Sequence, residues 1–347
     1  MLNNNKTIFI AEAGVNHNGS IKIACKLIDI ASNAGADFIK FQHTNPNLIS
    51  NRTNLTLDQK LTSKSKLNQK KLTESFHLDW EKAYPILIKR SKKKKIKFLT
   101  SVFSSSDYDK VKKYKLGFIK VASGEIVNYP LLLNISKSKD TVFLSTGGST
   151  LKEIEQAVKI LKKKYKKKKI FLLHCVSSYP VPINQINLRS IEYLIKKTNC
   201  EVGYSDHGLG SDHLLTAIGF GAKVIEKHFT IKKSLSGPDH NISLEPLELK
   251  KIIDRIRKIE LSLGICNKKV QLCEKKNISI IRQSLHASKL IKKNTVLNKN
   301  NICFMRPYNG IDPMSYFKII NNYKTNKELK KQDPIKSKNI KKIKYNN

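Results

Sequence analysis

Eight short runs of β-forming residues alternate with helical patterns over the first 264 residues, and this alternation limits the possible folds more than any other feature. The stretches between the runs have apolar residues at helical spacing, most clearly 21–35, 151–165 and 246–264. Strands that are joined through helices run parallel, and eight such units predict a (β/α)8 barrel of the α/β class. The predicted strands are 8–13, 38–42, 97–103, 118–123, 141–146, 170–176, 201–207 and 224–230.

An open, doubly wound sheet is the alternative fold for this pattern. Its dinucleotide-binding members carry a glycine-rich turn of fixed spacing after the first strand. Residues 14–20 read GVNHNGS here and do not have that spacing. The barrel is therefore the preferred interpretation.

Two segments break the alternation. Residues 44–79 form a long polar insertion between the second strand and its helix, and loops of that length in a barrel are usually functional lids or disordered tips. The pattern changes again near residue 265, where a linker precedes short apolar runs. We therefore expect three parts: a barrel domain over 1–266, a linker over 267–278 and a small, partly β domain over 279–347.

The chain is strongly basic, with 66 Lys and Arg residues against 27 Asp and Glu residues and a formal net charge of +39. Such a charge is common in nucleic-acid-binding proteins. Lysines far outnumber arginines, however, and they form runs such as 92–95 and 162–169 near the polar ends of predicted helices. Surfaces that read or stack on bases favour Arg and interleaved aromatic residues. The Lys, Asn and Ile bias of an AT-rich genome accounts for the charge, so we expect no nucleic-acid partner.

The sequence also bears on location. The N-terminal MLNNNKTIFIAEAG has no apolar signal core with a small-residue cleavage site. No stretch reaches the roughly 18 uninterrupted apolar residues of a membrane-spanning helix. The six cysteines lack the paired spacing of zinc sites and lie in or beside apolar runs, which predicts reduced, mostly buried thiols. We expect a cytoplasmic protein with no membrane partner.

Polar residues gather where the predicted strands end, which is where barrel enzymes carry their active sites. A lone His or Ser there is usually a hydrogen-bonded structural group, but the joint pattern indicates a site. Lys40 and Lys120 lie within apolar strands, where an unpaired charge is costly to bury. They need an anion, either a carboxylate such as Glu125 or a phosphate-bearing ligand. The hydroxyl residues that could complete a phosphate cradle are Ser101, Ser123, Ser177 and Ser205.

A metal site is the second feature of these strand ends. His207 and His228 end adjacent strands, so their imidazoles could bind one divalent ion. Two His ligands with oxygen donors suit Mn²⁺, Mg²⁺ or Zn²⁺. Asp239 follows the eighth strand within SGPDH and is near enough in sequence to act as an acid–base or orienting group.

These motifs resemble, in order along the chain, those of the N-acetylneuraminate synthase family, which includes the sialic, legionaminic and pseudaminic acid synthases. The tail, with MRPYNGIDP (305–313), resembles the antifreeze-protein-like (SAF, β-clip) domain of the same family. The resemblance covers nearly the full chain. The matching segments of the barrel are AEAGVNHNGS (11–20), GADFIKFQ (35–42), IKVASGEIVNYPLL (119–132), LSTGG (144–148), LLHCVSSYP (172–180), VGYSDH (202–207), VIEKHFT (224–230) and SGPDHNISLEP (236–246).

The resemblance implies an activity, a cofactor and an assembly. Members of the family condense phosphoenolpyruvate with the open-chain aldehyde of an N-acetylmannosamine-type sugar and release phosphate, which would make the protein a transferase. The implied cofactor is a divalent metal, with Mn²⁺ preferred over Mg²⁺ or Co²⁺. Family members are domain-swapped homodimers, in which the antifreeze-like domain of one subunit caps the barrel of the other.

The resemblance also implies roles for the matching residues. Two of them, His207 and His228, would hold the metal. Arg306 would reach in from the partner subunit to bind the N-acetyl group. The residues implied to face the sugar or to manage the protons are Glu12, Glu125, Tyr179 and Asp239. The residues implied to lie around phosphoenolpyruvate are Lys40, Ser101, Lys120, Ser123, Ser177 and Ser205.

The chain departs from the family pattern at several positions. Ser101 and Val102 stand where a Thr-Pro pair is usual, Val176 where Thr is usual, Gly148 where Met is common and Tyr308 where Gly is common. No predicted metal ligand or lysine is lost, but the departures leave room for an altered sugar preference or a weakened enzyme. The AEAGVNHNGS and ASGE segments favour the sialic and legionaminic branches over the pseudaminic one, without choosing between the two.

Two other functions fit parts of the pattern. Another metal-dependent barrel enzyme that uses phosphoenolpyruvate, such as a deoxy-sugar-acid synthase acting on a phosphorylated aldose, would have no antifreeze-like tail with an Arg-Pro motif. A non-catalytic relic of the family would have lost its charged pocket residues. The chain keeps all four of Lys40, Lys120, His207 and His228.

Overall fold

The computed structural model describes residues 6–49, 69–167 and 169–344. The chain divides into two compact units, Met1–Gly264 and Ile265–Asn347. The first unit contains all eight predicted strands of the barrel. The second unit has its own small core.

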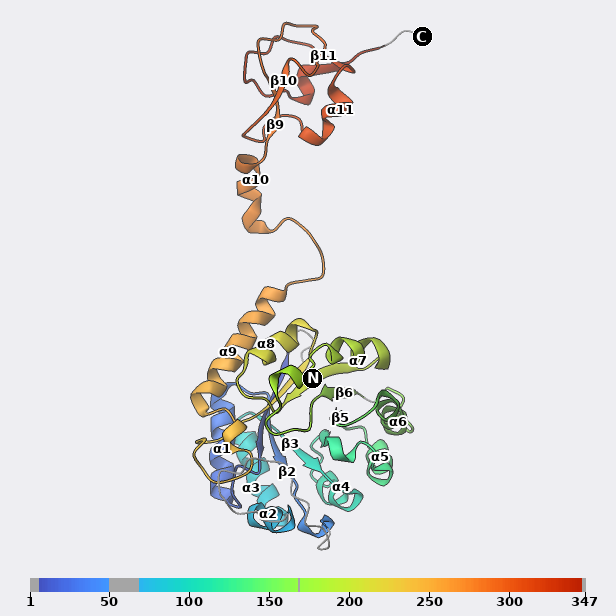
Figure 1. The fold of residues 1–347 in the computed structure, drawn as a ribbon, viewed down its shortest axis with the longest axis vertical. Coiled ribbons are helices and arrows are strands. Elements are labelled where there is room, and N and C mark those ends of the chain that lie inside the picture. The colour runs from blue at the N-terminus through green and yellow to red at the C-terminus, as the bar shows by residue number, and fades with distance from the viewer. Residues whose placement is uncertain (1–5, 50–68, 168, 345–347) are drawn as a thin grey trace. The chain divides into compact units, whose positions relative to one another are not determined.

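Eight parallel strands form a closed barrel in the first unit (Figure 1). β1 pairs with β2 on one edge and with β8 on the other, which closes the sheet and excludes the open, doubly wound alternative. The barrel prediction is therefore confirmed. The strands are β1 (Ile8–Gly14), β2 (Phe38–Gln42), β3 (Lys97–Val102), β4 (Phe118–Val121), β5 (Thr141–Ser145), β6 (Ile170–His174), β7 (Glu201–Asp206) and β8 (Val224–His228).

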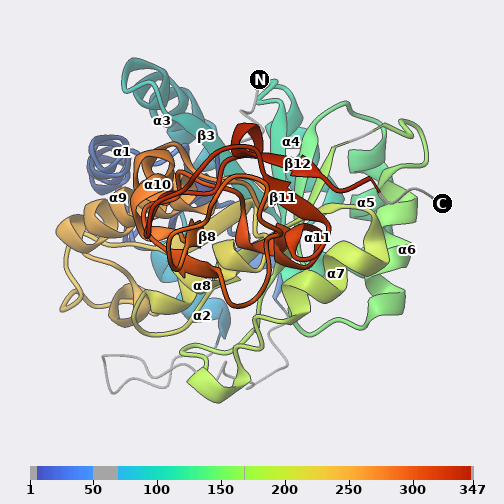
Figure 2. The same ribbon diagram turned by 90° about the horizontal axis from the view of Figure 1, so that it is seen from above.

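Helices surround the barrel strands in Figure 1, and the view from above in Figure 2 also shows helices on both sides of the strands. The first helix illustrates how the sequence sets its bounds: the Ser20 hydroxyl caps the N-terminus, and Gly35 ends the helix in the left-handed conformation, at φ 87°. The helices are α1 (Ile21–Ala34), α2 (Gln69–Phe76), α3 (Trp80–Lys93), α4 (Ser105–Lys112), α5 (Tyr129–Ser136), α6 (Leu151–Leu161), α7 (Ser190–Thr198), α8 (Asp212–Gly219) and α9 (Pro246–Leu263).

The barrel interior changes from apolar to polar along each strand. Side chains on one face of a strand recur every second residue, so Ile8, Ile10 and Glu12 share the inward face of β1. Aromatic rings fill the closed end, where Phe38 and Phe143 lie 5.6 Å apart between ring centroids. The inward positions near the carboxyl ends are polar, so the apolar floor supports a polar mouth. The buried apolar residues of the floor are Ile8, Ile10, Phe38, Leu99, Phe143, Phe171, Leu173 and Val224.

The second unit is small and partly β. Two antiparallel pairs form in it, β9 (Ser284–Ala287) with β10 (Ile302–Met305) and β11 (Tyr323–Thr325) with β12 (Ile340–Lys342). Its helices are α10 (Lys275–Ile281) and α11 (Tyr316–Ile319). The apolar residues buried together in its core are Leu285, Ala287, Ile291, Leu297, Ile302, Ile319, Leu329 and Ile335.

The polar insertion predicted over 44–79 is only partly covered. A short 3₁₀ turn forms at Pro46–Leu48, and α2 follows later in the same segment. Residues 50–68, the middle of the insertion, lie outside the described residues.

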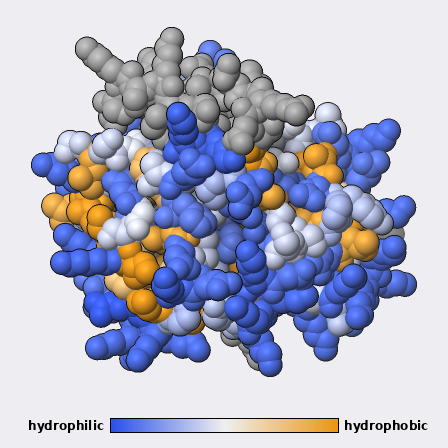
Figure 3. Space-filling model, turned by 90° about the horizontal axis from the view of Figure 1, so that it is seen from below, coloured by the Kyte–Doolittle hydropathy of each residue, from blue (hydrophilic) through white to orange (hydrophobic). Residues whose placement is uncertain are grey.

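The surface agrees with the basic, lysine-rich composition. Figure 3 shows one face of the molecule, on which hydrophilic residues predominate and hydrophobic ones form small groups. None of the described helices is both long and apolar enough to cross a membrane. All six cysteines are free, but the expectation that they are mostly buried is wrong: only Cys175 is buried, and Cys266 and Cys273 are exposed near the start of the second unit.

Candidate active site

A cavity of about 380 Å³ opens at the carboxyl ends of the barrel strands. It brings together side chains from all eight strands or the loops that follow them, because parallel strands of a barrel end at one rim. Most residues predicted for the site line this cavity. They are Glu12, Lys40, Ser101, Lys120, Ser123, Ser177, Tyr179, Ser205, His207 and His228.

Two buried lysines and two buried carboxylates lie at the bottom of the cavity, above the apolar floor of the barrel. Lys40 Nζ lies 2.8 Å from Glu12 Oε1 and 3.7 Å from Glu226 Oε1. Lys120 Nζ lies 3.5 Å from the same Glu226 oxygen and donates to the Ser145 hydroxyl at 2.7 Å. We name Glu12, Lys40, Lys120 and Glu226 the inner cluster. The anion that the buried lysines need is thus supplied partly by Glu12 and Glu226.

Glu125, a carboxylate that was expected to pair with these lysines, lies outside the inner cluster. It accepts a hydrogen bond from Asn128 Nδ2 at 2.6 Å and is half-buried in the neighbouring pocket. It follows β4 in a short 3₁₀ turn (Ser123–Glu125), which carries its side chain past the barrel interior. The choice of Glu125 as the partner carboxylate of the buried lysines is therefore wrong.

The ionisation of the inner cluster follows from its burial. Burial raises the pKa of Glu12 against the opposing effect of Lys40. Burial also acts to raise the pKa of Glu226, but Lys120 and Lys40 outweigh it and lower that pKa below its usual value. Burial lowers the pKa of Lys120, whereas Glu12 and Glu226 raise that of Lys40 despite its burial. One oxygen of each carboxylate, Oε2, is buried without a hydrogen-bond partner among the described residues.

Small side chains meet the loop after β5 on one side of the cavity. The backbone N–H of Gly147 donates to the Ser123 hydroxyl at 3.1 Å, and Cys175 Sγ lies 3.1 Å from the same hydroxyl. A Cβ atom at Gly147 would come within 2.4 Å of Ser177 Oγ and 2.8 Å of Cys175 Sγ. A residue larger than Gly would therefore fill this part of the cavity. Lys120, Ser123 and Ser177 line the same cavity, and a lysine with hydroxyl groups is suited to a phosphate-bearing ligand.

Two imidazoles face the cavity from β8 and from the end of β7. Their ring centroids are 5.7 Å apart, and the ring of Tyr179 packs on His207 at 4.1 Å. His207 Nδ1 bonds to the Val176 carbonyl at 2.9 Å, which leaves Nε2 for a ligand. Burial lowers the pKa of His207 to about 4 and that of His228 well below its usual value, so both rings are neutral at pH 7.

The chemistry of these two histidines is compatible with a divalent metal, and the metal site stays a prediction. A neutral imidazole presents the lone pair that a metal needs, and His228 Nδ1 is buried without a hydrogen-bond partner among the described residues. No group of three or more His, Cys, Asp or Glu side chains in the described parts of the chain is arranged to hold a metal. The remaining ligands would therefore be water or substrate oxygens, which suits a catalytic ion with open positions.

A second pocket of about 560 Å³ adjoins the first and shares Gln42, Phe103 and Tyr179 with it. It holds the other two predicted carboxylates, Glu125 and Asp239. Burial, together with Glu12, raises the pKa of Asp239 to about 7. The pocket is lined by both polar and apolar residues. The apolar ones are Val15, Leu48, Ile49, Phe76, Phe103 and Pro238.

Arg306 is the one predicted site residue that belongs to the second unit. Its Nε donates to the carbonyl of Ile281, at the end of α10, at 2.7 Å. The neighbouring Tyr308 N–H donates to the carbonyl of Ser279 in the same helix at 2.7 Å. The segment that carries Arg306 is therefore held against α10.

A model of the NeuB family matches residues 27–268 of the chain. The chain belongs to the NeuB family. An N,N'-diacetyllegionaminic acid synthase from Campylobacter jejuni is 42% identical over 333 residues, which cover 95% of this chain and 99% of that protein. An enzyme of the same name from Legionella pneumophila is 34% identical and covers 90% of this chain and 88% of its own length. These NeuB-family relatives are sugar-acid synthases.

Solved structures agree with the family assignment. An N-acetylneuraminic acid synthetase from Leptospira borgpetersenii, determined in complex with citrate, superposes with a TM-score of 0.71 at 36% identity. The match covers 79% of this chain and 91% of that one.

Four polar residues that line the cavity in the barrel mouth were given no role from the sequence: Gln42, Ser145, Ser178 and Glu226. Glu226 matters most, because it is shared by the two buried lysines. The signal that could have found it is the two-residue period of β8, which puts Glu226 on the same inward face as His228.

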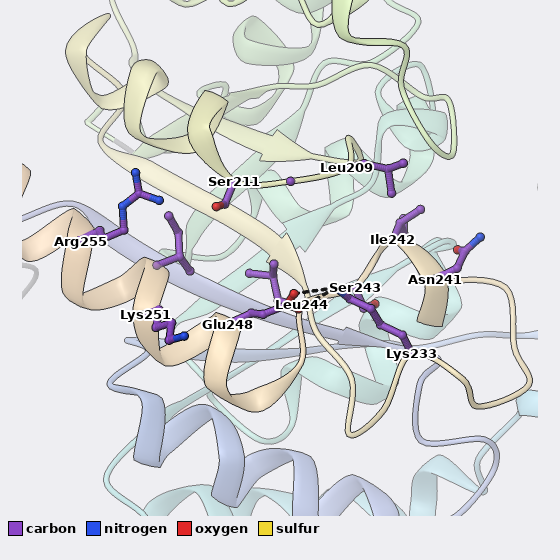
Figure 4. A pocket seen from close by; sticks show the side chains of 12 residues that line it. Leu209, Ser211, Lys233, Asn241, Ile242, Ser243, Leu244, Glu248, Lys251 and Arg255 are labelled. Carbon is purple, nitrogen blue, oxygen red and sulfur yellow. Dashed lines mark hydrogen bonds and ion pairs between the residues drawn. The ribbon is translucent and has the colours of Figure 1, made fainter.

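Another cavity of about 230 Å³ lies beside α9 and the loops after β7 and β8 (Figure 4). It is lined by none of the predicted site residues. Two of its cations are paired, Lys233 with Glu248 and Arg255 with Asp212. It is separate from the cavity in the barrel mouth.

Proposed function

We propose that this NeuB-family protein is a transferase that condenses phosphoenolpyruvate with the aldehyde of an N-acetylated amino sugar and releases phosphate. We further propose that the acceptor is the diacetamido sugar of the legionaminic branch and that the enzyme acts in the cytoplasm, where phosphoenolpyruvate is made. The names of the relatives from Campylobacter jejuni and Legionella pneumophila support the choice of branch. The apolar residues that line the second pocket also support it, since a diacetamido acceptor presents an additional methyl group.

The inner cluster carries this proposal. It places two ammonium groups around one shared carboxylate, Glu226, at the bottom of a cavity rich in hydroxyl groups. Among the described residues, the only carboxylate paired with Lys120 is Glu226, at 3.5 Å, so an anionic group beside Lys120 would gain a charge-assisted contact, which supports a phosphate and carboxylate ligand such as phosphoenolpyruvate. Because the lysines and hydroxyls are held before the substrate arrives, little reorganisation is needed as charge develops. The proposed phosphoenolpyruvate residues are Lys40, Ser101, Lys120, Ser123, Ser177 and Ser205.

His207 and His228 would hold the divalent metal, for which we propose Mn²⁺. When bound, such an ion would polarise the aldehyde oxygen as a Lewis acid. The enol carbon of phosphoenolpyruvate attacks the aldehyde carbon, water adds to the resulting oxocarbenium carbon, and the tetrahedral product expels phosphate. Tyr179 packs on His207 and lines both pockets, which supports a place for it beside the sugar.

Three carboxyl groups are candidates for moving protons in this reaction. Glu12 lies in the phosphoenolpyruvate half of the site, and Glu125 and Asp239 lie in the proposed sugar pocket. All three have pKa values raised by burial, so each can hold a proton more readily than an exposed carboxyl group. We propose them as the catalytic acids and bases without ranking them.

For the second unit we propose the antifreeze-like fold over 279–347, after a linker over 267–278, and a domain-swapped homodimer. Two observations support an assembly that covers apolar surface. The barrel-mouth loops expose Val127, Ile183 and Leu209, the first turn of α9 exposes Leu247, and the second unit exposes Phe304, Met314 and Phe317. Arg306 would reach in from the partner subunit to bind the N-acetyl group, as the segment held by α10 would allow.

The test is phosphate release from phosphoenolpyruvate with Mn²⁺, comparing N-acetylmannosamine, its 6-deoxy diacetamido analogue and no sugar. We expect release with the diacetamido sugar, and its loss on chelation and in the His207→Ala variant. Faster release with N-acetylmannosamine would move the protein to the sialic branch. Absence of release with every aldehyde, from a folded and metal-supplemented dimer, would rule out the synthase proposal.

A further inference from the structure

A second buried ion pair lies next to the inner cluster but outside the barrel interior. Lys227 alternates with Glu226 and His228 along β8, so it faces the surrounding helices, where it is 1% exposed. Its Nζ bonds to Asp206 Oδ2. Asp206, at the end of β7, is also 1% exposed. We name Asp206 and Lys227 the wall pair.

The wall pair is fully engaged with its surroundings. Asp206 Oδ1 accepts from the Tyr204 hydroxyl at 2.7 Å and from the Gly208 N–H at 2.8 Å. Its Oδ2 lies 2.9 Å from His213 Nε2, in addition to Lys227. Lys227 Nζ also donates to the Gly208 carbonyl. The pair therefore binds both backbone polar groups of Gly208, one with each member.

Gly208 directly follows His207, so these bonds act on the histidine. The peptide group that joins the two residues is held at both ends: its N–H by Asp206 at 2.8 Å and its carbonyl by the Val181 N–H at 3.2 Å. The loop continues through Leu209 to Ser211, on the wall of the neighbouring cavity (Figure 4). With the peptide held and Nδ1 bonded to Val176, the imidazole has little freedom to rotate or shift.

The energetic cost of the wall pair suggests that it does more than stabilise the fold. Burying two charges is expensive, and well-packed apolar residues often replace such a pair at little cost in stability. Every contact of the pair described above is made within its own strands, α8 and the backbone beside His207. We propose that Asp206 and Lys227 are positioning residues for the reaction. By holding Gly208 they set the orientation of His207 and, through the bond from Val181 to His207, that of the segment that carries Tyr179. We name the bonds from the wall pair to Gly208 the clamp. This inference rests on the proposed function only for its effect on turnover.

The position of His207 is separable from the binding of phosphoenolpyruvate. Lys40 and Lys120 are held by Glu12, Glu226 and Ser145, none of which touches the wall pair in the contacts described. A loosened clamp should therefore reduce the turnover number kcat and leave the KM for phosphoenolpyruvate nearly unchanged. A general loss of folding would not separate the two constants in this way.

The test compares two double variants of the full-length protein. Asp206→Leu with Lys227→Met removes both charges and both bonds to Gly208, and we expect kcat to fall about 100-fold, the effect of a misplacement near 1 Å, with a KM change under about threefold. Asp206→Asn with Lys227→Met keeps an acceptor for the Gly208 N–H and should recover at least about tenfold of that loss. The control is Asp29→Asn with Arg90→Met, which removes an ion pair between α1 and α3 and should change neither constant.

A second readout does not depend on activity. Deuterium exchange at the imidazole C2 position, followed by mass spectrometry, reports each histidine separately in the resting enzyme. In the Asp206→Leu, Lys227→Met variant we expect exchange at His207 to accelerate at least about fivefold, while His286 of the second unit stays unchanged. Faster exchange at His207 without any activity in the wild-type protein would support the clamp and contradict the proposed function.

Unchanged kcat and unchanged His207 exchange in a folded double variant would overturn the clamp, as would equal acceleration at every barrel histidine. If that variant does not fold, the Gly208→Ala variant takes its place in the test. The added Cβ would lie 3.2 Å from Asp206 Oδ1 and press on the carboxylate with all charges retained. We expect a severalfold fall in kcat with selectively faster His207 exchange, and normal exchange in this variant would refute the proposal.

Discussion

The inner cluster and the wall pair are two sets of buried charges on neighbouring strands, and they differ in how completely they are paired. Both oxygens of Asp206 in the wall pair have partners. In the inner cluster, Glu12 and Glu226 each have one buried oxygen without a hydrogen-bond partner among the described residues, and two ammonium groups share Glu226. A set of buried charges whose polar atoms are all paired favours one arrangement of the chain. A set with unpaired polar atoms can still gain binding free energy when a ligand supplies the missing contacts.

The largest expected effect comes from breaking the complete set. Lys227→Met leaves the buried Asp206 carboxylate without its ammonium partner, so the free energy of unfolding should fall by about 3–5 kcal/mol. Urea unfolding followed by circular dichroism measures the change. Lys82→Met is the control, because Lys82 is an exposed lysine paired with Asp79, and its loss should cost less than about 1 kcal/mol. Equal free energies of unfolding for Lys227→Met and Lys82→Met would contradict the proposed difference between the wall pair and an exposed ion pair.

Breaking the incomplete set should affect catalysis and spare the fold. Lys120→Met leaves Glu226 paired with Lys40, and burial already lowers the pKa of Lys120, so unfolding should change by less than about 1 kcal/mol. The kcat/KM for phosphoenolpyruvate should fall about 100-fold, which corresponds to about 2.7 kcal/mol of transition-state stabilisation. Lys97→Met is the matched control. Lys97 is the first residue of β3, at the end of the strand away from the cavity, so this variant should keep its activity. Loss of stability with normal kcat/KM would reverse the assignment.

The smallest expected effect is on acid stability. Burial acts to raise the pKa of Asp206, but His213 and Lys227 outweigh it and hold that pKa well below its usual value. A depressed pKa contributes stability that is present above the unfolded value, near 3.9, and is lost as the pH falls below it toward the folded value. Between pH 5 and pH 3 the wild type should therefore lose about 1 kcal/mol more than Asp206→Asn with Lys227→Met. Parallel pH profiles for the two proteins would contradict this linkage.

The fold could be predicted because its signal is repetitive. Each strand of the barrel is a short β-rich run, and capping residues such as Gly35 mark helix ends in the sequence itself. The floor of the barrel follows from the two-residue alternation of strands such as β1. The middle of the insertion after β2, at 50–68, is not among the described residues, and its predicted role stays a prediction.

The site could be predicted only as far as strand ends reveal it. His207, His228, Lys40 and Lys120 meet in one cavity as expected from their places on parallel strands. The partner of the lysines was misassigned because proximity in sequence favoured Glu125, whereas pairing across the closed barrel brings in Glu226 from β8. Charge pairing between strands far apart in the chain is set by barrel closure, which no local pattern encodes. The roles proposed for the individual residues remain predictions.

The two pockets of the barrel mouth differ in the kind of backbone that carries them. The inner cluster stands on strands β1, β2, β4 and β8, whose register is fixed by the ladder of the closed barrel. The second pocket is built mainly from loop residues, among them Thr44, Asn45, Phe103, Asn128 and Pro238. Loops accept insertions and exchanges that strands of a closed barrel do not. If the second pocket binds the sugar as proposed, evolution can exchange one acceptor for another by replacing loops while the strand-borne inner cluster stays intact, and a new specificity could be grafted onto this barrel in the same way.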